Sequence, residues 1–141
     1  MIFNQNKDYV NAGNALCKTI NEFGKFDWVE LWTANVEQTH LQLISHYMAN
    51  PNDEIFYTIS ENITTFKYDE GFIGKVWAGR TQMVWDNIDQ QDDFLRKNAA
   101  HEIGLKSLLG IPLIFNDEVF GVLNIGSKYE SNYLQKYTKI F

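Results

Sequence analysis

The sequence predicts an α/β (α+β) domain with three layers, in which a central, mainly antiparallel sheet of about six strands lies between two layers of helices. In segment 119–125, both faces of the expected strand are apolar: one face carries Val119, Gly121, Leu123 and Ile125, and the other carries Phe120 and Val122. A strand with two apolar faces needs cover on both sides. Apolar residues at helical spacing near the two ends and in the middle of the chain provide helices for both layers.

The first part of the chain predicts a helix followed by a β-hairpin. Residues 8–23 carry apolar or small side chains at helical spacing, with Asp8 as a cap and Gly24 as the stop. Two stretches of β-branched and aromatic residues, 28–33 and 41–47, then predict strands joined by a polar loop.

Segment 54–68 fits either kind of structure. Phe56, Ile59 and Ile63 have helical spacing, whereas residues 63–68 are rich in strand-forming side chains and fit a strand better.

The middle of the chain predicts two helices separated by a short strand. Residues 71–79 form the first helix and residues 83–85 the strand. The second helix spans 91–102, with Asp92 and Asp93 in its first turn, where carboxylates complement the helix dipole, and Gly104 ends it.

The last part of the chain predicts a hairpin and a closing helix. Strands 105–115 and 119–125 are joined at Asn116-Asp117, and Pro112 should lie at an edge or an unpaired position because it has no N–H to donate. An apolar stripe over residues 131–141 predicts the start of a terminal helix, so residues 1–141 are interpreted as one domain.

Composition excludes several classes of protein. The 45% hydrophobic content can fill a core, and the net charge of −6 argues against a nucleic-acid surface. No apolar run approaches the length of a membrane span, and the N-terminus does not have the pattern of a signal peptide. The single cysteine, Cys17, rules out an intramolecular disulfide and favours a cytoplasmic location.

Four segments, in this order, resemble the motifs of GAF domains. They are Gly71-Phe72-Ile73-Gly74-Lys75-Val76-Trp77, Val84-Trp85-Asp86, the run from Gly104 to Leu113, and Gly121-Val122-Leu123-Asn124-Ile125. The resemblance implies a non-catalytic sensory module of a signal-transduction protein. The Val76-Trp77 pair looks particularly like GAF domains of sensor histidine kinases in two-component systems. It also implies a homodimer formed through terminal helices and contacts with other domains of the parent protein.

The resemblance further implies a small-molecule pocket between the sheet and the helices at 71–79 and 91–102. The expected ligand-binding residues are Glu30, Phe72, Ile73, Phe94, Asn98, His101 and Asn124. Phe72, Ile73 and Asn124 follow from their places in the motifs, whereas the helix phase suggests Phe94, Asn98 and His101. Glu30, between two tryptophans on a strand, lies either in water at the sheet's end or buried with a partner, where it could anchor a ligand.

Two other functions remain open at this stage. The first is a ligand-free dimerisation or interaction scaffold with a closed core. The second is an enzyme that resembles methionine sulfoxide reductases, which the single cysteine disfavours because those enzymes exchange disulfides. No cofactor and no metal are expected: His40 and His46 are predicted to share one strand face about 20 Å apart, too far to bind one ion.

Overall fold

The computed structural model describes residues 2–139, with side chains from Lys7 onward, and its centre is a six-stranded sheet. The strand order is β3-β2-β1-β6-β5-β4, and all neighbours are antiparallel. The strands are β1 (Trp28–Ala34), β2 (His40–Met48), β3 (Thr65–Lys67), β4 (Met83–Asp86), β5 (Ser107–Phe115) and β6 (Glu118–Ser127). The predicted sheet is therefore confirmed.

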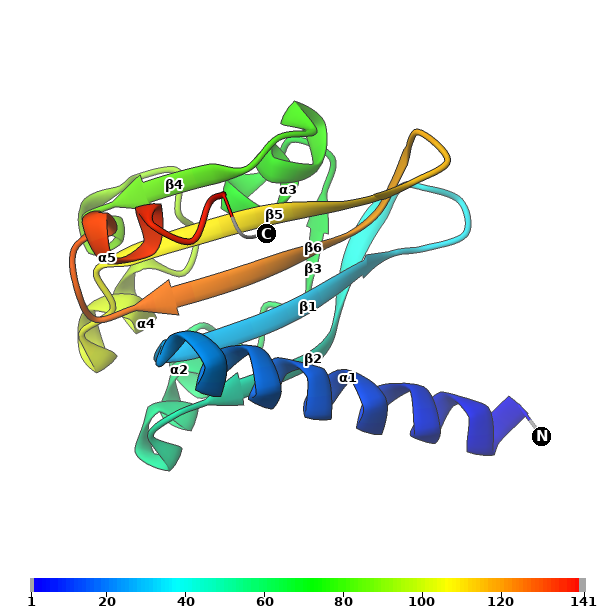
Figure 1. Cartoon of the computed structure of the whole chain (residues 1–141), viewed down its shortest axis with the longest axis horizontal. Coiled ribbons are helices and arrows are strands. Elements are labelled where there is room, and N and C mark those ends of the chain that lie inside the picture. Colours follow the sequence, from blue (N-terminus) through cyan, green and yellow to red (C-terminus); the bar gives the residue numbers. More distant parts are fainter. Residues whose placement is uncertain (1, 140–141) are drawn as a thin grey trace.

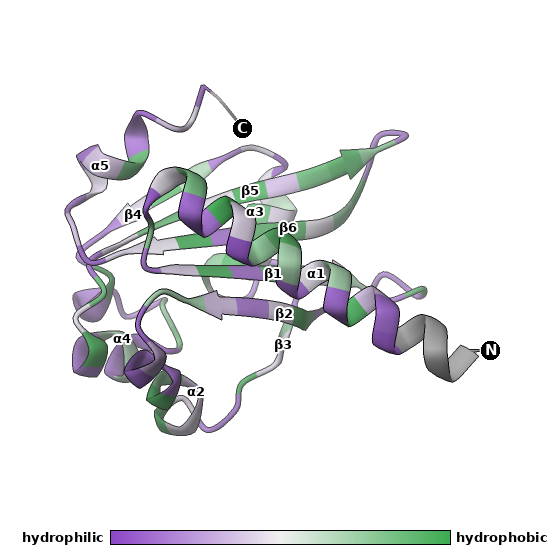
Figure 2. Ribbon diagram, turned by 60° about the horizontal axis from the view of Figure 1, so that its bottom comes forward, coloured by the Kyte–Doolittle hydropathy of each residue, from purple (hydrophilic) through white to green (hydrophobic). Residues whose placement is uncertain are grey.

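Helices cover both faces of this sheet (Figures 1 and 2). The helices are α1 (Ile2–Gly24), α2 (Ile55–Ile59), α3 (Gly71–Gly79), α4 (Lys97–Ile103) and α5 (Ser131–Gln135), with 3₁₀ turns η1 (Pro51–Glu54) and η2 (Ile88–Gln90). The terminal helices α1 and α5 lie on one face, and α2, α3 and α4 lie on the other. The three-layer prediction is confirmed, including which helices cover which face.

The alternation of β1 divides the buried residues into two cores. Trp28 and Trp32 belong to the core under α2, α3 and α4, whereas Val29 and Leu31 belong to the core under α1 and α5. Successive strand side chains point to opposite faces, so Glu30 lies on the same face as the two tryptophans.

Two bulges change the faces that strict alternation predicts. The β5–β6 register shifts between Leu113 and Ile114, which leaves Phe120 as an extra residue on β6, and Val119 then packs in the same core as Val122. The prediction that Val119 shares a face with Leu123 is therefore wrong.

The second bulge lies on β2. Its register with β1 shifts between Leu31 and Trp32. Leu41 and Met48 consequently face the same core, although they are seven positions apart and strict alternation would put them on opposite faces. His40 and His46 therefore lie on opposite faces, not on one face as the even spacing predicts.

Several element bounds differ from those predicted. Helix α1 extends back to Ile2, so Asp8 lies inside it and is not its cap. Helix α4 begins at Lys97, so the expected helix over 91–102 is wrong in its first half, and Asp92 and Asp93 precede it. Segment 54–68 contains both structures that its sequence allows, helix α2 and the short strand β3.

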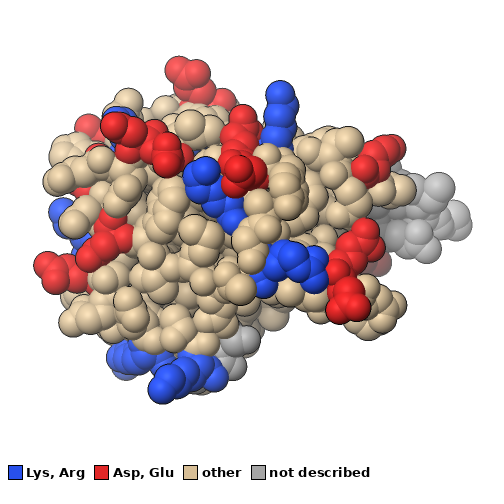
Figure 3. Space-filling view, turned by 90° about the horizontal axis from the view of Figure 1, so that it is seen from above, with Lys and Arg blue, Asp and Glu red and all other residues tan. Residues whose placement is uncertain are grey.

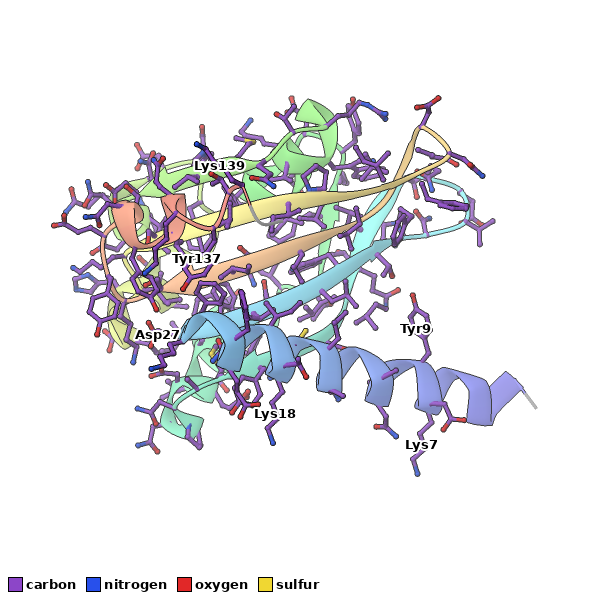
Figure 4. The ribbon with its side chains drawn as sticks, viewed as in Figure 1. Lys7, Tyr9, Lys18, Asp27, Tyr137 and Lys139 are labelled. Carbon is purple, nitrogen blue, oxygen red and sulfur yellow. The ribbon has the colours of Figure 1, made fainter. Side chains whose placement is uncertain are left out.

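The C-terminal segment is folded back on the end of α1. Helix α5 ends at Gln135 and gives way to turns, so the predicted helix over 131–141 is correct only in its first turn; residues 140 and 141 lie outside the described residues. The Tyr133 hydroxyl donates to the carbonyl oxygen of Gly24, and the Tyr137 ring centre lies 4.9 Å from that of Phe26 (Figure 4).

The β5–β6 hairpin follows its prediction closely. Asn116 and Asp117 both have positive φ, 51° and 63°, as a two-residue turn requires here. Pro112 pairs with Val122 of β6 on one side. On its other side, β4 begins at Met83, which pairs with Gly110, so β4 does not extend as far as Pro112 and needs no N–H from it.

The surface charge and the hydropathy of the helices agree with what the composition predicts about nucleic-acid binding and membrane spans. On the face shown in Figure 3, basic and acidic side chains are interspersed, and the basic ones do not merge into one patch. None of the helices within residues 2–139 has the length and hydropathy that a membrane span requires.

Candidate functional site

The candidate site is centred on Glu30, in the middle of a central strand. Strand β1 is paired on both sides, with Glu30 opposite His46 of β2 and Asn124 of β6. The Glu30 side chain is completely buried. A buried carboxylate is costly unless it is paired and hydrogen-bonded, so its partners decide what this site can do.

Glu30 accepts hydrogen bonds from four side chains that come from different parts of the chain. Arg96 donates twice, from Nη1 to Oε2 at 2.9 Å and from Nη2 to Oε1 at 3.0 Å. Oε1 also accepts from Trp32 Nε1 and Asn124 Nδ2, both at 2.9 Å, and Oε2 accepts from the Tyr57 hydroxyl at 2.7 Å. Glu30, Tyr57, Arg96 and Asn124 are called the buried polar cluster below.

These contacts fix the protonation state of the cluster. Burial alone would raise the pKa of the Glu30 carboxyl, but the charge of Arg96 and the hydrogen bonds from Arg96, Asn124 and Tyr57 outweigh it and lower the pKa. Burial, followed by the Glu30 charge, raises the pKa of the Tyr57 hydroxyl well above 10. Glu30 is therefore a carboxylate and Tyr57 a neutral donor at neutral pH.

Five aromatic rings surround the Arg96 guanidinium. Its Cζ atom lies 5.0 Å from the ring centre of Trp28, and the other ring centres lie at 5.2 Å (Phe56), 5.4 Å (Trp32), 5.5 Å (Phe66) and 5.7 Å (Phe94). These five residues form what we call the aromatic cage. All five distances are within the range in which an aromatic ring attracts a cation.

Two polar atoms of the cluster lack a hydrogen-bond partner. Among the buried side-chain atoms of the described residues, Arg96 Nε and Asn124 Oδ1 are unpaired, together with Asn21 Oδ1 elsewhere in the domain. Nearly all buried polar atoms in proteins are satisfied, so Arg96 Nε and Asn124 Oδ1 are candidates for contact with a water molecule or a further polar group.

The structure brings together three of the predicted site residues, Glu30, Asn124 and Phe94. Phe94 precedes α4, and its ring is part of the aromatic cage. Phe72 and Ile73 are fully buried in the same core, where Phe72 packs against Trp85.

The prediction that Phe94, Asn98 and His101 share one helix face is wrong, because Phe94 precedes α4. The buried positions of α4 are Ala99, Ala100 and Ile103, so Asn98 and His101 are exposed. His101 Nδ1 lies 3.3 Å from a carboxylate oxygen of Asp89 at the surface.

Sequence reasoning missed Arg96 and Tyr57. The chain has only two arginines, Arg80 and Arg96, and only Arg96 lies in the segment that the sequence places over the pocket. A buried glutamate needs a cation, and the segments expected over the pocket offer Lys75, Arg96 and Lys97; among these, Arg96 is favoured because arginine is the usual bidentate partner. Nothing comparable in the sequence singles out Tyr57.

A shallow depression of about 230 Å³ lies above the cluster. One wall is formed by Leu95, Arg96, Asn98 and Ala99, and the other by Ile59, Ser60, Glu61 and Ile63 after α2. Arg96 is the cluster residue that borders this depression, although its side chain and that of Glu30 are both fully buried. The site is therefore a packed polar centre under a small surface hollow, and not an open cavity.

The histidines and Cys17 are among the remaining side chains that could ligate a metal or act as a nucleophile. In the described part of the chain, no three His, Cys, Asp or Glu side chains are grouped so that they could hold a metal ion. Cys17 is fully buried under α1 on the opposite face of the sheet, and burial, followed by the Glu30 charge, raises the pKa of its thiol to about 12.

Comparison with known proteins identifies the family: the chain belongs to the GAF domain family, which matches residues 10–140. GAF domains are generally regulatory or sensory modules. No curated protein matched the sequence.

Three solved structures illustrate the range of proteins with this fold. The GAF domain of A. Aeolicus nlh2 in an inactive state is 19% identical (TM-score 0.72, 94% of this chain and 77% of that chain). Free methionine-R-sulfoxide reductase from Neisseria meningitidis is also 19% identical (0.65, 94% and 74%). The GAF domain of a phosphoenolpyruvate-protein phosphotransferase from Coxiella burnetii is 18% identical (0.68, 99% and 85%). At such identities the likeness shows the fold alone.

Proposed function

We propose that this GAF domain is a sensory module of a signal-transduction protein, and that a small molecule binds at the buried polar cluster. The observation that supports this is the fully buried Glu30 carboxylate, which four side chains from separate parts of the chain hold. Apolar residues in place of a buried ion pair are often neutral or stabilising, so stability alone does not require such a centre. We therefore interpret the centre as a recognition site.

The finer parts of the proposal concern the parent protein. We place the domain in the cytoplasm, in a sensor histidine kinase of a two-component system, because of the single thiol and the Val76-Trp77 pair in its motif. The domain itself is non-catalytic, and α1 and α5 pair two subunits and transmit the ligand state.

Exposed apolar side chains along α1 support this pairing. Tyr9 and Leu16 leave apolar surface exposed on the helix. Figure 4 shows Tyr9 pointing away from the side that carries Lys7 and Lys18, so one side of α1 is suited to contact a second subunit.

The second candidate function is a ligand-free dimerisation or interaction scaffold. Its support is the packing of the cluster, since the aromatic cage is filled by the chain's own Arg96. In that case Glu30 and Arg96 serve only to define the fold.

A reductase function has less support, although reductases of this fold exist. Thiol chemistry requires an accessible thiolate, whereas Cys17 is buried and its thiol pKa is about 12. Turnover of free methionine sulfoxide by the purified protein would contradict this reasoning.

Native mass spectrometry of the protein purified under gentle conditions tests the main proposal. We expect an adduct that is lost on denaturation, that persists in Glu54→Gln, an exposed control, and that disappears in a folded Glu30→Gln variant. Bare masses for all three proteins would favour the scaffold. The dimer fraction in the same spectra tests subunit pairing.

A further inference from the structure

The Arg96 guanidinium sits in its cage as a bound organic cation would. A carboxylate that accepts two parallel hydrogen bonds, together with aromatic faces on several sides, is a general means of recognising a cation. Trp28 and Trp32 come from β1, Phe56 from α2 and Phe66 from β3. Most of the cage is therefore built by elements other than the one that carries the arginine.

The segment that carries Arg96 is at the surface and has little regular structure. Residues 91–96 belong to neither a helix nor a strand, and within them only Phe94 and Arg96 are buried. The backbone hydrogen bonds of this segment are local, such as the one from Phe94 N–H to the carbonyl of Gln91. An outward movement of the segment would break the contacts of these two side chains, and it would strain the side-chain hydrogen bonds of Gln91 to Asp86 and of Lys97 to Asp92.

The depression described above borders the segment that carries Arg96, and the cage is closed as long as the Arg96 side chain stays fully buried in it. Arg96 lines it together with Glu61, which is exposed at the opposite wall and contributes negative charge. A cation approaching from solvent would pass Glu61 and would meet Glu30 once segment 91–96 has moved outward. An anion would meet the same charges with unfavourable sign, and aromatic walls provide no ligating atoms for a metal ion.

We infer, resting on the proposed function, that the aromatic cage and Glu30 form a binding site for small alkylguanidinium compounds, and that Arg96 occupies this site as a built-in competitor. A ligand enters when segment 91–96 moves outward, and its guanidinium group replaces that of Arg96 on Glu30. The charge inside the cage is the same before and after the exchange. The unpaired Asn124 Oδ1 gives the ligand an additional acceptor.

The test uses the full chain and methylguanidinium chloride as the probe, with sodium chloride and urea as controls. The indole N–H signals of Trp28 and Trp32 are followed by NMR, because both rings lie in the cage and Trp32 donates to Glu30. We expect saturable shifts of both signals with methylguanidinium and with neither control. If the wild-type signals do not respond, or respond without saturation, the inference is wrong.

Removal of the competitor sharpens the test. If the outward arrangement has a population of about 1%, Arg96→Ala should bind methylguanidinium roughly 100-fold more tightly than the wild type. Arg80→Ala, which alters the exposed arginine, should leave the affinity unchanged, and Glu30→Gln should abolish binding. Binding to Arg96→Ala alone, with no binding to the wild type, would mean that Arg96 is a permanent structural residue and would also overturn the inference.

The proposed function can fail separately. An uncharged or anionic adduct in native mass spectrometry would support a sensory site and contradict the guanidinium assignment, whereas saturable methylguanidinium binding without any natural adduct would leave this site intact. If the Arg96→Ala variant does not fold, the titration of the wild-type protein still decides the outcome.

Discussion

Arg96→Ala is the substitution that most directly tests the energetics of the buried polar cluster. It removes a guanidinium that donates two hydrogen bonds to Glu30, and both side chains are completely buried. Glu30 would retain Trp32, Tyr57 and Asn124 as donors but no counter-charge. Loss of one partner of a buried ion pair costs about 3–5 kcal/mol, because the other charge remains in a poorly solvated place.

This cost is large compared with the stability of a domain of this size. Small domains unfold with roughly 5–15 kcal/mol, and urea slopes are about 1–3 kcal/mol per molar, so the unfolding midpoint should fall by about 2 M. The assay is urea unfolding followed by tryptophan fluorescence. Arg80→Ala is the matched control, since Arg80 is exposed and donates to the carbonyl of Asp117; it should change stability by less than about 0.5 kcal/mol.

A double variant separates the missing charge from the missing packing. Glu30→Leu combined with Arg96→Met removes both charges, and it should recover part of the stability that Arg96→Ala loses. Trp32, Tyr57 and Asn124 each lose an acceptor in this variant, so full recovery is not expected. A loss below about 1 kcal/mol for Arg96→Ala would refute the reasoning, because it would mean that Glu30 does not depend on its counter-charge.

Three further predictions concern individual residues. Since the folded-state pKa of Glu30 is lowered, its stabilising effect is present above its ordinary pKa of 4.5 and is lost as the pH falls through the folded value; acid unfolding of Glu30→Gln should lack this part of the pH dependence. Gly74→Ala should destabilise by about 1–3 kcal/mol, because a Cβ there would clash with the Lys67 carbonyl oxygen, whereas Gly79→Ala, with open space, should be neutral in thermal unfolding. The Cys17 thiol, with a pKa of about 12, should react with iodoacetamide at about pH 8 only in urea; rapid labelling of the native protein would contradict its burial.

Much of the fold is predictable because its signals are local. Two apolar faces on one strand required helices on both sides of the sheet, and Asn116-Asp117 marked a turn by its backbone preference alone. The two bulges could not be found in this way. Each depends on how a strand pairs with its neighbour, and the sequence carries no local mark for the extra residue at Phe120.

The candidate site was predictable where a residue stood out in its local sequence. Glu30 stood out because a carboxylate between two tryptophans is unusual, and Asn124 followed from its motif. The expected helix phase turned Asn98 and His101 toward the core, whereas both are exposed on α4, with Asn98 at the edge of the depression beside Arg96. The register of a short helix is set by tertiary contacts, here the burial of Ala99, Ala100 and Ile103, and only weakly by its own sequence.

The position of the cluster restricts how a change at Arg96 can reach the terminal helices. One route crosses the sheet, since Glu30 alternates with Val29 and Leu31, which pack in the core under α1. This route needs β1 to shift, although β1 is hydrogen-bonded on both sides by long strands.

The other route follows the edge of the sheet. The Gln91 side chain donates to the carbonyl oxygen of Asp86, and the Asp86 carboxylate accepts from the backbone and hydroxyl of Ser131 at the start of α5. Asp86 ends β4, a four-residue edge strand that is paired only with β5. Local stability is lowest where few backbone groups are paired, so displacement of segment 91–96 meets less resistance along this edge than through β1. An exchange at Arg96 that leaves Glu30 in place would therefore be communicated to α5 before α1.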